Sequence, residues 1–187
     1  MKLLVVNNHD SFVYNIIQIL GKLGNSYDVV NNEDADKVNI EKYEKIIISP
    51  GPGTPLNASD RGNVDILLDM AVDQDILGVC FGHQLLGMRM GSEIRVMEEP
   101  MHGEIDVMVH SDSPLYYGIP EKFHAVRYHS LAISGTDHIV VDCVSEKDGA
   151  IMGFHSMDMK RFGVQFHPES YYSEYGEKII SNFLEAC

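Results

Sequence analysis

Short runs of consecutive apolar residues alternate with segments of helical periodicity through the first half of the chain. A run of this kind suits a strand that is covered on both faces. The predicted strands lie at residues 3–6, 27–30, 45–48 and 76–79. Apolar residues that recur every three or four positions predict helices over residues 12–23 and 61–72. Strands that alternate with helices are typical of an α/β fold with a doubly wound, mostly parallel open sheet.

The second half of the chain has a different pattern, in which short apolar segments follow one another with turns between them. The strand candidates lie at residues 93–97, 105–109, 139–144, 150–154 and 162–166. Such a succession predicts antiparallel strands added to the parallel sheet in the C-terminal half. A last helix is expected over residues 174–184. No linker, internal repeat or low-complexity tract interrupts residues 1–187, so we expect a single domain.

A cysteine with a glycine two residues to either side follows the fourth predicted strand and precedes a predicted helix over residues 84–90. Gly78, Cys80 and Gly82 match the turn that presents a nucleophile between a strand and a helix, with Cys in place of Ser. Side chains at the two glycines would collide with the neighbouring strand and helix. The helix N-terminus stabilises negative charge on the sulfur or on an oxyanion. The alternative is a buried cysteine that serves as a small apolar core residue.

A second motif follows the last predicted strand, where His167, Pro168 and Glu169 stand in succession. Proline restricts the backbone between the two polar residues, so they keep a set relation. Cysteine chemistry needs a base that takes the thiol proton and returns it to a leaving amine, and a carboxylate that holds the imidazole. Cys80, His167 and Glu169 supply these three groups. Either residue of the second motif alone would be read as a structural histidine or a surface glutamate, and the cysteine is what favours a triad.

The third predicted strand ends in a loop rich in proline and glycine, residues 50–55. It is no dinucleotide fingerprint, because Leu56 stands where the third glycine belongs, and no Gly-Lys-Ser/Thr follows as in a phosphate loop. A plain turn is the alternative. Glycines allow a close approach of the backbone to a small substrate, which suits an oxyanion hole beside a nucleophile. The ends of parallel strands lie at one edge of a sheet, so we expect this loop close to Cys80.

Composition narrows the classes of function. The 187 residues are 44% hydrophobic and 22% charged, as is typical of soluble globular proteins. The formal net charge of −14 argues against nucleic acid or an anionic membrane as a partner. Cys80, Cys143 and Cys187 form no C-x-x-C pair, and the N-terminal apolar run is too short for a signal peptide, so we expect a cytoplasmic protein. Cys187 is expected to be exposed. No metal site is expected, because no carboxylate stands at ligand spacing beside His129 or His124.

Six segments together carry a resemblance to a known family. They are residues 8–15, 49–55, 78–84, 101–103, 127–131 and 163–170. In these segments, which follow in family order over essentially the whole chain, the sequence resembles class I glutamine amidotransferases of the triad type. More narrowly, it is similar to the glutaminase subunits of anthranilate synthase (component II) and of aminodeoxychorismate synthase.

The resemblance implies a role for each matching residue. Cys80 would attack the side-chain amide of L-glutamine, with His167 as acid and base and Glu169 as the group that orients it. The thioester that forms would release ammonia and then be hydrolysed by water. The backbone N–H groups of Gly51 and Phe81 would form the oxyanion hole. The residues implied to hold glutamine are Gly51, Pro52, Gly53, Gln84, Ser130 and Leu131.

The resemblance also implies that the ammonia passes to a separate, chorismate-binding synthase subunit. Magnesium is expected on that partner, and no cofactor is expected in this chain. Anthranilate synthase of tryptophan biosynthesis is the leading hypothesis, and aminodeoxychorismate synthase of folate biosynthesis, or service to both, is the alternative. A GMP synthase glutaminase subunit is less favoured, because that branch has Gly-Gly-Pro where this chain has Pro50-Gly51-Pro52. The remaining alternatives are a cysteine hydrolase of another kind and a noncatalytic binding subunit.

Overall fold

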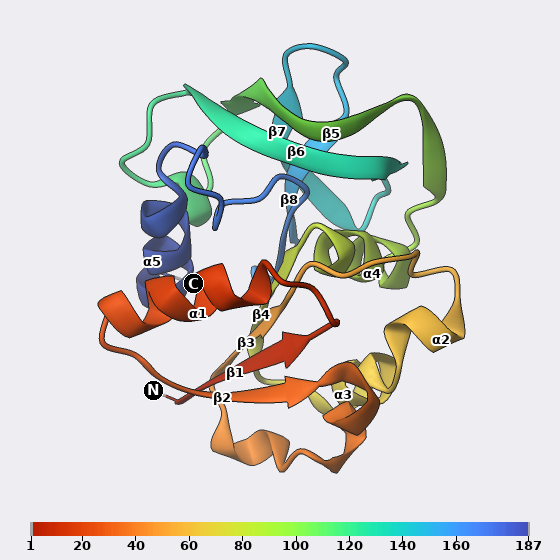
Figure 1. The fold of residues 1–187 in the computed structure, drawn as a ribbon, viewed down its shortest axis with the longest axis vertical. Helices are drawn as coiled ribbons and strands as arrows, with labels where there is room; N and C mark the ends of the chain where they lie inside the picture. The colour runs from red at the N-terminus through yellow and green to blue at the C-terminus, as the bar shows by residue number, and fades with distance from the viewer. Residues whose placement is uncertain (1, 187) are drawn as a thin grey trace.

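Nine strands of the computed structural model, which describes residues 2–186, hydrogen-bond into one sheet. They are β1 (Lys2–Asn7), β2 (Ser26–Asn31), β3 (Lys45–Ile48), β4 (Asp75–Val79), β5 (Ile94–His110), β6 (Lys122–Ile133), β7 (Ile139–Ser145), β8 (Ile151–Ser156) and β9 (Arg161–Val164). Their order is β2-β1-β3-β4-β9-β8-β7-β5-β6 (Figure 1). Neighbours from β2 to β9 pair in parallel, and neighbours from β9 to β6 pair antiparallel. The predicted fold class is confirmed. Cys187 lies outside the described residues.

Helices cover both faces of the parallel part of the sheet. They are α1 (Val13–Lys22), α2 (Ala58–Arg61), α3 (Val64–Met70), α4 (Phe81–Arg89) and α5 (Gly176–Ala186), with the 3-10 turns η1 (Asn32–Lys37), η2 (Ile40–Lys42) and η3 (Pro114–Tyr116). α1 and α5 contribute to the core on one face, and α3 and α4 contribute to the core on the other. Within residues 2–186 no helix has the length and apolar character that a membrane crossing requires.

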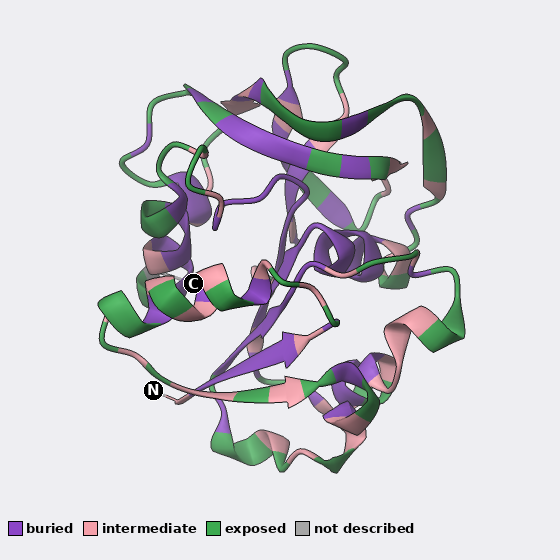
Figure 2. Ribbon diagram, viewed as in Figure 1, coloured by how far each residue is buried: buried purple, intermediate pink, exposed green. Residues whose placement is uncertain are grey.

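β1 shows why a run of consecutive apolar residues forms a central strand. Alternate side chains of a strand point to opposite faces. Leu3 and Val5 therefore pack on the face of α1 and α5, while Leu4 and Val6 pack on the face of α3 and α4. All four are buried, as are nearly all residues of the parallel strands β3 and β4 in Figure 2. Among the described residues the edge strand β2 pairs with β1 alone, and it is partly exposed.

The segment after β3 departs from the predicted helix over residues 61–72. The structure has two helices, α2 and α3, with Gly62 between them at φ 56°, a conformation that favours glycine. A Cβ at Gly62 would lie 2.8 Å from the backbone carbon of Asn32. The following residue, Asn63, donates its N–H to the Asn32 carbonyl at 2.9 Å. The helix breaks because the chain docks against η1, a contact that the local periodicity does not reveal.

β5 and β6 form a long antiparallel ribbon, whereas the sequence pattern predicts only two short strands in the same region. Two strands are predicted at residues 93–97 and 105–109, but β5 runs as one strand of 17 residues. Its register against β6 shifts between Val96 and Met101 and again between His102 and Glu104. β6 itself is not predicted, although it supplies the partner for most of β5. Pairing across the ribbon satisfies the backbone of polar residues that have little strand character of their own.

The elbow between β4 and α4 is tighter than predicted, because α4 begins at Phe81 rather than at residue 84. A Cβ at Gly78 would overlap the Gly82 carbonyl group at the start of α4. A Cβ at Gly82 would overlap the Ile48 carbonyl oxygen of β3. Both elbow glycines are therefore required for the helix to pack this closely on the two strands.

We expect Gly78→Ala to lower the free energy of unfolding by about 1–3 kcal/mol, the usual cost of an overpacked interior. The added methyl group meets backbone atoms, which cannot rotate away. Chemical denaturation followed by circular dichroism measures the change. Gly21→Ala is the control, because this helical glycine of α1 is exposed and has nothing within 4 Å of a new Cβ. It should raise stability by about 0.5–1 kcal/mol. Equal effects of the two substitutions would contradict the steric account.

Candidate active site

The carboxyl ends of three neighbouring strands, β3, β4 and β9, lie at one edge of the sheet. β3 leads into the proline–glycine loop, β4 into Cys80, and β9 through Gln165 into His167. β4 pairs in parallel register with both of the other strands, so the three strands end at the same height of the sheet. The sheet thereby brings together three motifs that lie far apart in the sequence.

Cys80 has a backbone conformation with a positive φ, at φ 51° and ψ −96°. Such a conformation costs a non-glycine residue on the order of 1–3 kcal/mol and tends to occur at functional sites. Its N–H donates to the Val164 carbonyl at 2.8 Å, and its own carbonyl accepts the first hydrogen bond of α4 from the Gln84 N–H at 3.0 Å. The N–H of Phe81 precedes that bond, so the helix itself gives it no partner. The sulfur is therefore carried next to a helix N-terminus.

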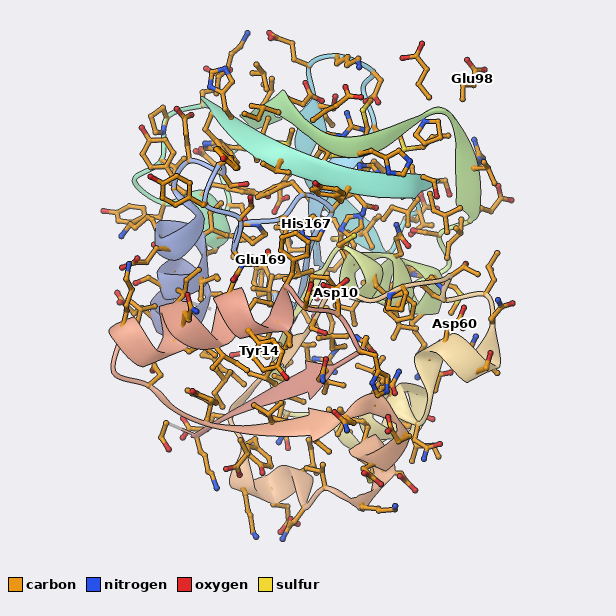
Figure 3. All side chains as sticks on the ribbon, in the orientation of Figure 1. Asp10, Tyr14, Asp60, Glu98, His167 and Glu169 are labelled. Carbon is orange, nitrogen blue, oxygen red and sulfur yellow. The ribbon has the colours of Figure 1, made fainter. Side chains whose placement is uncertain are left out.

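His167 and Glu169 form a buried pair in which Nδ1 and Oε1 lie 2.7 Å apart (Figure 3). Their side chains are only 3% and 0% exposed, so water does not compete for this contact. The His167 carbonyl accepts from the Ser173 hydroxyl at 2.6 Å, and its N–H donates to the Val126 carbonyl at 2.9 Å. The imidazole is thus held through both its backbone and its ring.

The Nε2 atom of His167 is the free end of this pair. It is buried and has no hydrogen-bond partner among residues 2–186. The rings of Phe12 and Tyr128 lie against the imidazole, with centroids 5.0 and 5.9 Å from its own. Burial opposes a charge on His167, but the Cys80 sulfur and the Glu169 carboxylate favour it more, so the pKa of His167 lies well above its ordinary value. The imidazole is therefore set to hold a proton opposite the sulfur.

A cavity of about 200 Å³ opens beside Cys80. The predicted residues that line it are Gly51, Gly53, Cys80, Phe81, Gln84, Ser130 and Leu131. Met101, His102, Tyr128 and His129 complete the lining. Pro52, predicted to hold the substrate, is exposed and is not part of this lining. The structure therefore gathers the predicted glutamine-binding residues around one cavity, apart from Pro52, while His167 and Glu169 lie outside its lining.

The proline–glycine loop is fixed by contacts that leave no room for larger residues. A Cβ at Gly51 would lie 2.6 Å from the Cβ of Asn8. Gly53 has φ 79°, and a side chain there would run into the Asp60 carboxylate. That carboxylate accepts the Thr54 N–H at 3.0 Å and so clamps the loop from outside. The loop can present its backbone to a ligand because it is held from behind.

Gln165, Phe12 and Tyr128 contact the triad, although the sequence assigns them no role. The amide nitrogen of Gln165 and the carbonyl oxygen of Tyr128 each lie 3.6 Å from the Cys80 sulfur. All three residues stand inside segments that carry the family resemblance, at residues 8–15, 127–131 and 163–170. Their position in those segments indicates that they belong to the site, but only the folded chain shows which atoms they contact.

A family model described as glutamine amidotransferase class-I matches residues 4–187. The chain belongs to the class I glutamine amidotransferase family.

Individual relatives agree with this assignment. The chain is 43% identical to anthranilate synthase component 2 of Saccharolobus solfataricus, with 97% of this chain and 96% of the relative covered. It is 40% identical to anthranilate synthase component 2 of Thermus thermophilus, covering 99% and 92%. Its fold is similar to the crystal structure of a putative GMP synthase subunit from Thermoplasma acidophilum, with a TM-score of 0.88 over 98% of this chain and 92% of that one. The sequence identity to that structure is 22%, so this likeness concerns the fold alone.

The amidotransferase site has the parts that acyl transfer to a thiol requires. Cys80 can act as the nucleophile, and Nε2 of His167 is the ring atom left to exchange a proton with it. Glu169 holds the other ring nitrogen and so determines the orientation of the imidazole. Within residues 2–186 no group of three or more His, Cys, Asp or Glu side chains could hold a metal ion.

We expect Glu169→Gln to lower the pKa of His167. Burial disfavours the imidazolium, and the substitution removes the Glu169 carboxylate that stabilises it. In the native protein the folded pKa is the higher one. The charged pair therefore stabilises the fold fully below a pH of about 6.5, and this contribution disappears as the pH rises through the raised pKa. A titration of the imidazole followed by NMR measures the shift.

Glu174→Gln is the matched control for this titration. Glu174 also pairs with a histidine, since its Oε2 lies 3.2 Å from Nδ1 of His124, but that pair is exposed. Its loss should leave the titration of His167 unchanged. A His167 titration in Glu169→Gln that matches the native one would contradict the electrostatic role of the carboxylate.

Proposed function

We propose that this chain is the glutaminase subunit of anthranilate synthase, which hydrolyses L-glutamine and passes ammonia to a chorismate-binding synthase subunit. The observation that carries the proposal is the buried pair of His167 and Glu169, whose imidazole interacts with the Cys80 sulfur, together with the cavity beside Cys80 that the predicted glutamine-binding residues other than Pro52 line. Two relatives that the chain matches over nearly its full length are named anthranilate synthase component 2. The names of these relatives support the assignment to anthranilate synthase, and the geometry of the site supports the hydrolysis of glutamine.

The reaction follows from the position of each group. His167 takes the thiol proton of Cys80 through Nε2, and the sulfur attacks the side-chain carbonyl carbon of glutamine. Backbone N–H groups of Phe81 and Gly51 stabilise the oxyanion of the tetrahedral intermediate. His167 then gives its proton to the leaving nitrogen, and ammonia departs. Water, activated by the same imidazole, hydrolyses the thioester and releases glutamate.

The size of the cavity favours a single amino acid as the substrate. Its volume of about 200 Å³ is below the range of roughly 300–1,000 Å³ that is usual for drug-sized ligands. Gly51 and Gly53 line it on one side, and residues 128–131 line it on another. A peptidase would need an extended groove for a chain on both sides of the nucleophile, so this cavity favours a glutaminase over that alternative.

The ammonia requires an acceptor outside this chain. We propose a chorismate-binding synthase subunit with magnesium as that partner, and the cytoplasm as the compartment, because a reducing environment keeps the Cys80 thiol free. Residues 1–187 would act as one amidotransferase domain within this complex. Aminodeoxychorismate synthase is the alternative partner, since the glutaminase chemistry is the same for both.

Cys80→Ala should abolish the release of glutamate from L-glutamine, with a fall in kcat on the order of a thousandfold or more, because the nucleophile is lost. Cys143→Ala is the control. Cys143 is a buried cysteine of β7 that does not line the cavity, so the variant should keep the native rate. Glutamate release that survives in Cys80→Ala would rule out the thioester mechanism. Peptide hydrolysis by the native chain without glutamate release, lost in Cys80→Ala, would favour a cysteine hydrolase of another kind.

The pathway can be tested by the product of the complex. We expect the chain to co-purify with a chorismate-binding synthase and to yield ortho-aminobenzoate from chorismate and glutamine, identified by mass spectrometry. Glutaminase activity should rise when the synthase is added. A 4-amino product would assign the chain to the folate pathway. Failure to bind any chorismate-binding synthase would contradict the proposed partner.

A further inference from the structure

A continuous series of buried and part-buried polar contacts runs from Arg127 of β6 to the sulfur of Cys80. Arg127 is fully buried, and its Nε–H donates to Nε2 of His129 at 3.0 Å. The other ring nitrogen of His129, Nδ1, lies 2.8 Å from the Leu131 carbonyl oxygen. These contacts follow one face of β6, because the side chains at residues 127 and 129 point the same way along a strand.

The same carbonyl connects β6 to the nucleophile. The amide nitrogen of Gln84 lies 3.2 Å from the Leu131 oxygen and 3.1 Å from the side-chain oxygen of Gln165. The amide nitrogen of Gln165 then lies 3.6 Å from the Cys80 sulfur. Gln84 and Gln165 are both buried, and the Leu131 carbonyl between Gln84 and His129 is part-buried beside the cavity.

The direction of every hydrogen bond in the series is determined by its ends. A guanidinium can only donate, and a carbonyl can only accept. His129 must therefore accept at Nε2 and donate from Nδ1, which makes it neutral. Burial and the Arg127 charge favour this form and lower the pKa of His129 to about 4, although its bond to Leu131 opposes the shift. Gln84 must present its NH₂ group to the carbonyl, and Gln165 must then present its oxygen to Gln84 and its NH₂ group to the sulfur.

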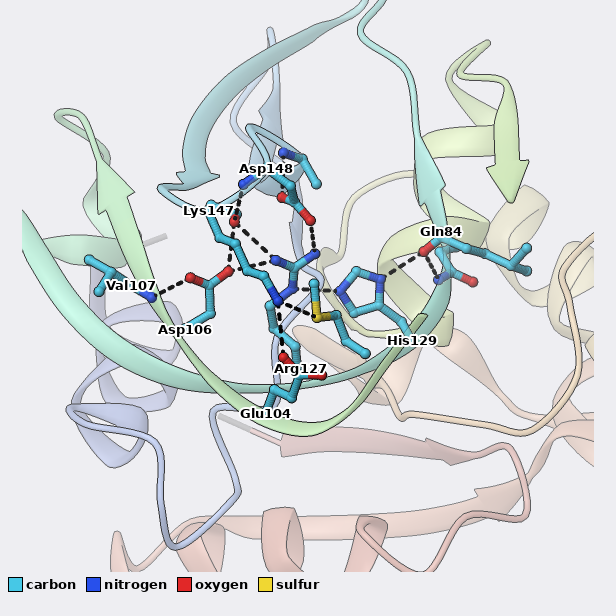
Figure 4. A network of polar contacts seen from close by, with 12 residues as sticks. Gln84, Glu104, Asp106, Val107, Arg127, His129, Lys147 and Asp148 are labelled. Carbon is cyan, nitrogen blue, oxygen red and sulfur yellow. Dashed lines mark hydrogen bonds and ion pairs between the residues drawn. The ribbon is translucent and has the colours of Figure 1, made fainter. Parts of the chain in front are cut away.

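Arg127 is itself held in one position by three groups (Figure 4). Its Nη1 donates to the Asp106 carboxylate at 2.6 Å and to the Ser145 hydroxyl at 2.9 Å. Its Nη2 donates to the Asp148 carboxylate at 2.8 Å. These bonds neutralise the buried guanidinium without any help from His129. The contact to His129 is therefore not needed to compensate the charge of Arg127.

We propose that His129 is a positioning residue of the glutamine site, with Arg127 selecting the tautomer in which it donates from Nδ1, and this inference rests on the proposed glutaminase function. His129 acts through the Leu131 carbonyl, which orients the amides of Gln84 and Gln165. Both hydrogens of the Gln84 amide are then committed. Its oxygen is the side-chain atom left for a ligand, which suits an N–H group of the bound glutamine.

The Leu131 carbonyl accepts two donors, His129 and Gln84, and a carbonyl oxygen has two lone pairs. Bound glutamine therefore does not donate to this oxygen. Contact between Leu131 and the substrate is left to other atoms of the residue. The residue that the sequence assigns to substrate binding thus also serves as the junction of the positioning network.

Two substitutions of His129 separate positioning from a purely structural role. His129→Asn places an amide near the position of Nδ1, so it keeps the donor to Leu131 and loses the contact to Arg127. His129→Gln places an amide near the position of Nε2, so it keeps the contact to Arg127 and loses the donor to Leu131. We expect kcat/KM for glutamine to stay within about threefold of native in the first variant and to fall at least about tenfold in the second, as for the loss of one buried hydrogen bond. The opposite order would overturn the proposal.

A second measurement does not depend on glutamine turnover. The rate constant of Cys80 alkylation by iodoacetamide, followed on the Cys80 peptide by mass spectrometry, should change at least threefold in His129→Gln. It should stay within twofold in His129→Asn, because Gln165 keeps its contact with the sulfur. If the two variants alkylate in this way but the native chain releases no glutamate, the proposed function fails while the network stands. An alkylation rate in His129→Gln equal to the native rate would overturn the network.

Thermal unfolding shows whether each variant is folded before its rates are compared. If His129→Gln does not fold, Gln165→Met supplies the same test at the other end of the series. It keeps the length of the side chain and removes the amide that contacts the sulfur. We expect the same change in the alkylation rate of Cys80 and a fall in kcat/KM of at least about tenfold. Native values for this variant would also overturn the proposal.

Discussion

The close packing of α4 on β3 and β4 is the constraint on which the site depends. Gly78 and Gly82 allow this packing because neither has a side chain to separate the helix from the strands. The chain between them must then turn within very few residues, and Cys80 takes up the positive-φ conformation that results. The backbone strain at one residue is offset by the burial of the helix, and it places a sulfur at the carboxyl edge of the sheet. Parallel pairing delivers the other parts of the site to the same edge.

Two buried histidines show how the surroundings assign opposite charge states to the same side chain. Burial disfavours the imidazolium of both. His167 faces the Cys80 sulfur and the Glu169 carboxylate, which raise its pKa well above the ordinary value. His129 faces the Arg127 guanidinium, and its pKa is lowered to about 4. One ring is therefore ready to exchange a proton with the nucleophile, while the other keeps a single tautomer and orients its neighbours.

Secondary structure was predictable where one physical cause dominates. The central parallel strands are covered on both faces, so their apolar runs are unambiguous. β6 escaped prediction because its buried face carries Phe123 and Ala125 followed by Arg127 and His129. Two of these four inward residues are polar, and the alternation that marks a strand disappears. The break at Gly62 was equally hidden, since it arises from docking against Asn32, which lies well before it in the sequence.

The sequence by itself determined the chemical parts of the site. The glycines around Cys80, the proline between His167 and Glu169, and the glycine-rich loop are local requirements, and local requirements can be read from neighbouring residues. Tertiary structure decided which atoms meet. It placed Gln165 on the sulfur, left Pro52 outside the cavity, and made the Leu131 carbonyl the junction of the buried network. These contacts join residues from different strands and helices, so their partners and the direction of each hydrogen bond exist only once the chain has folded.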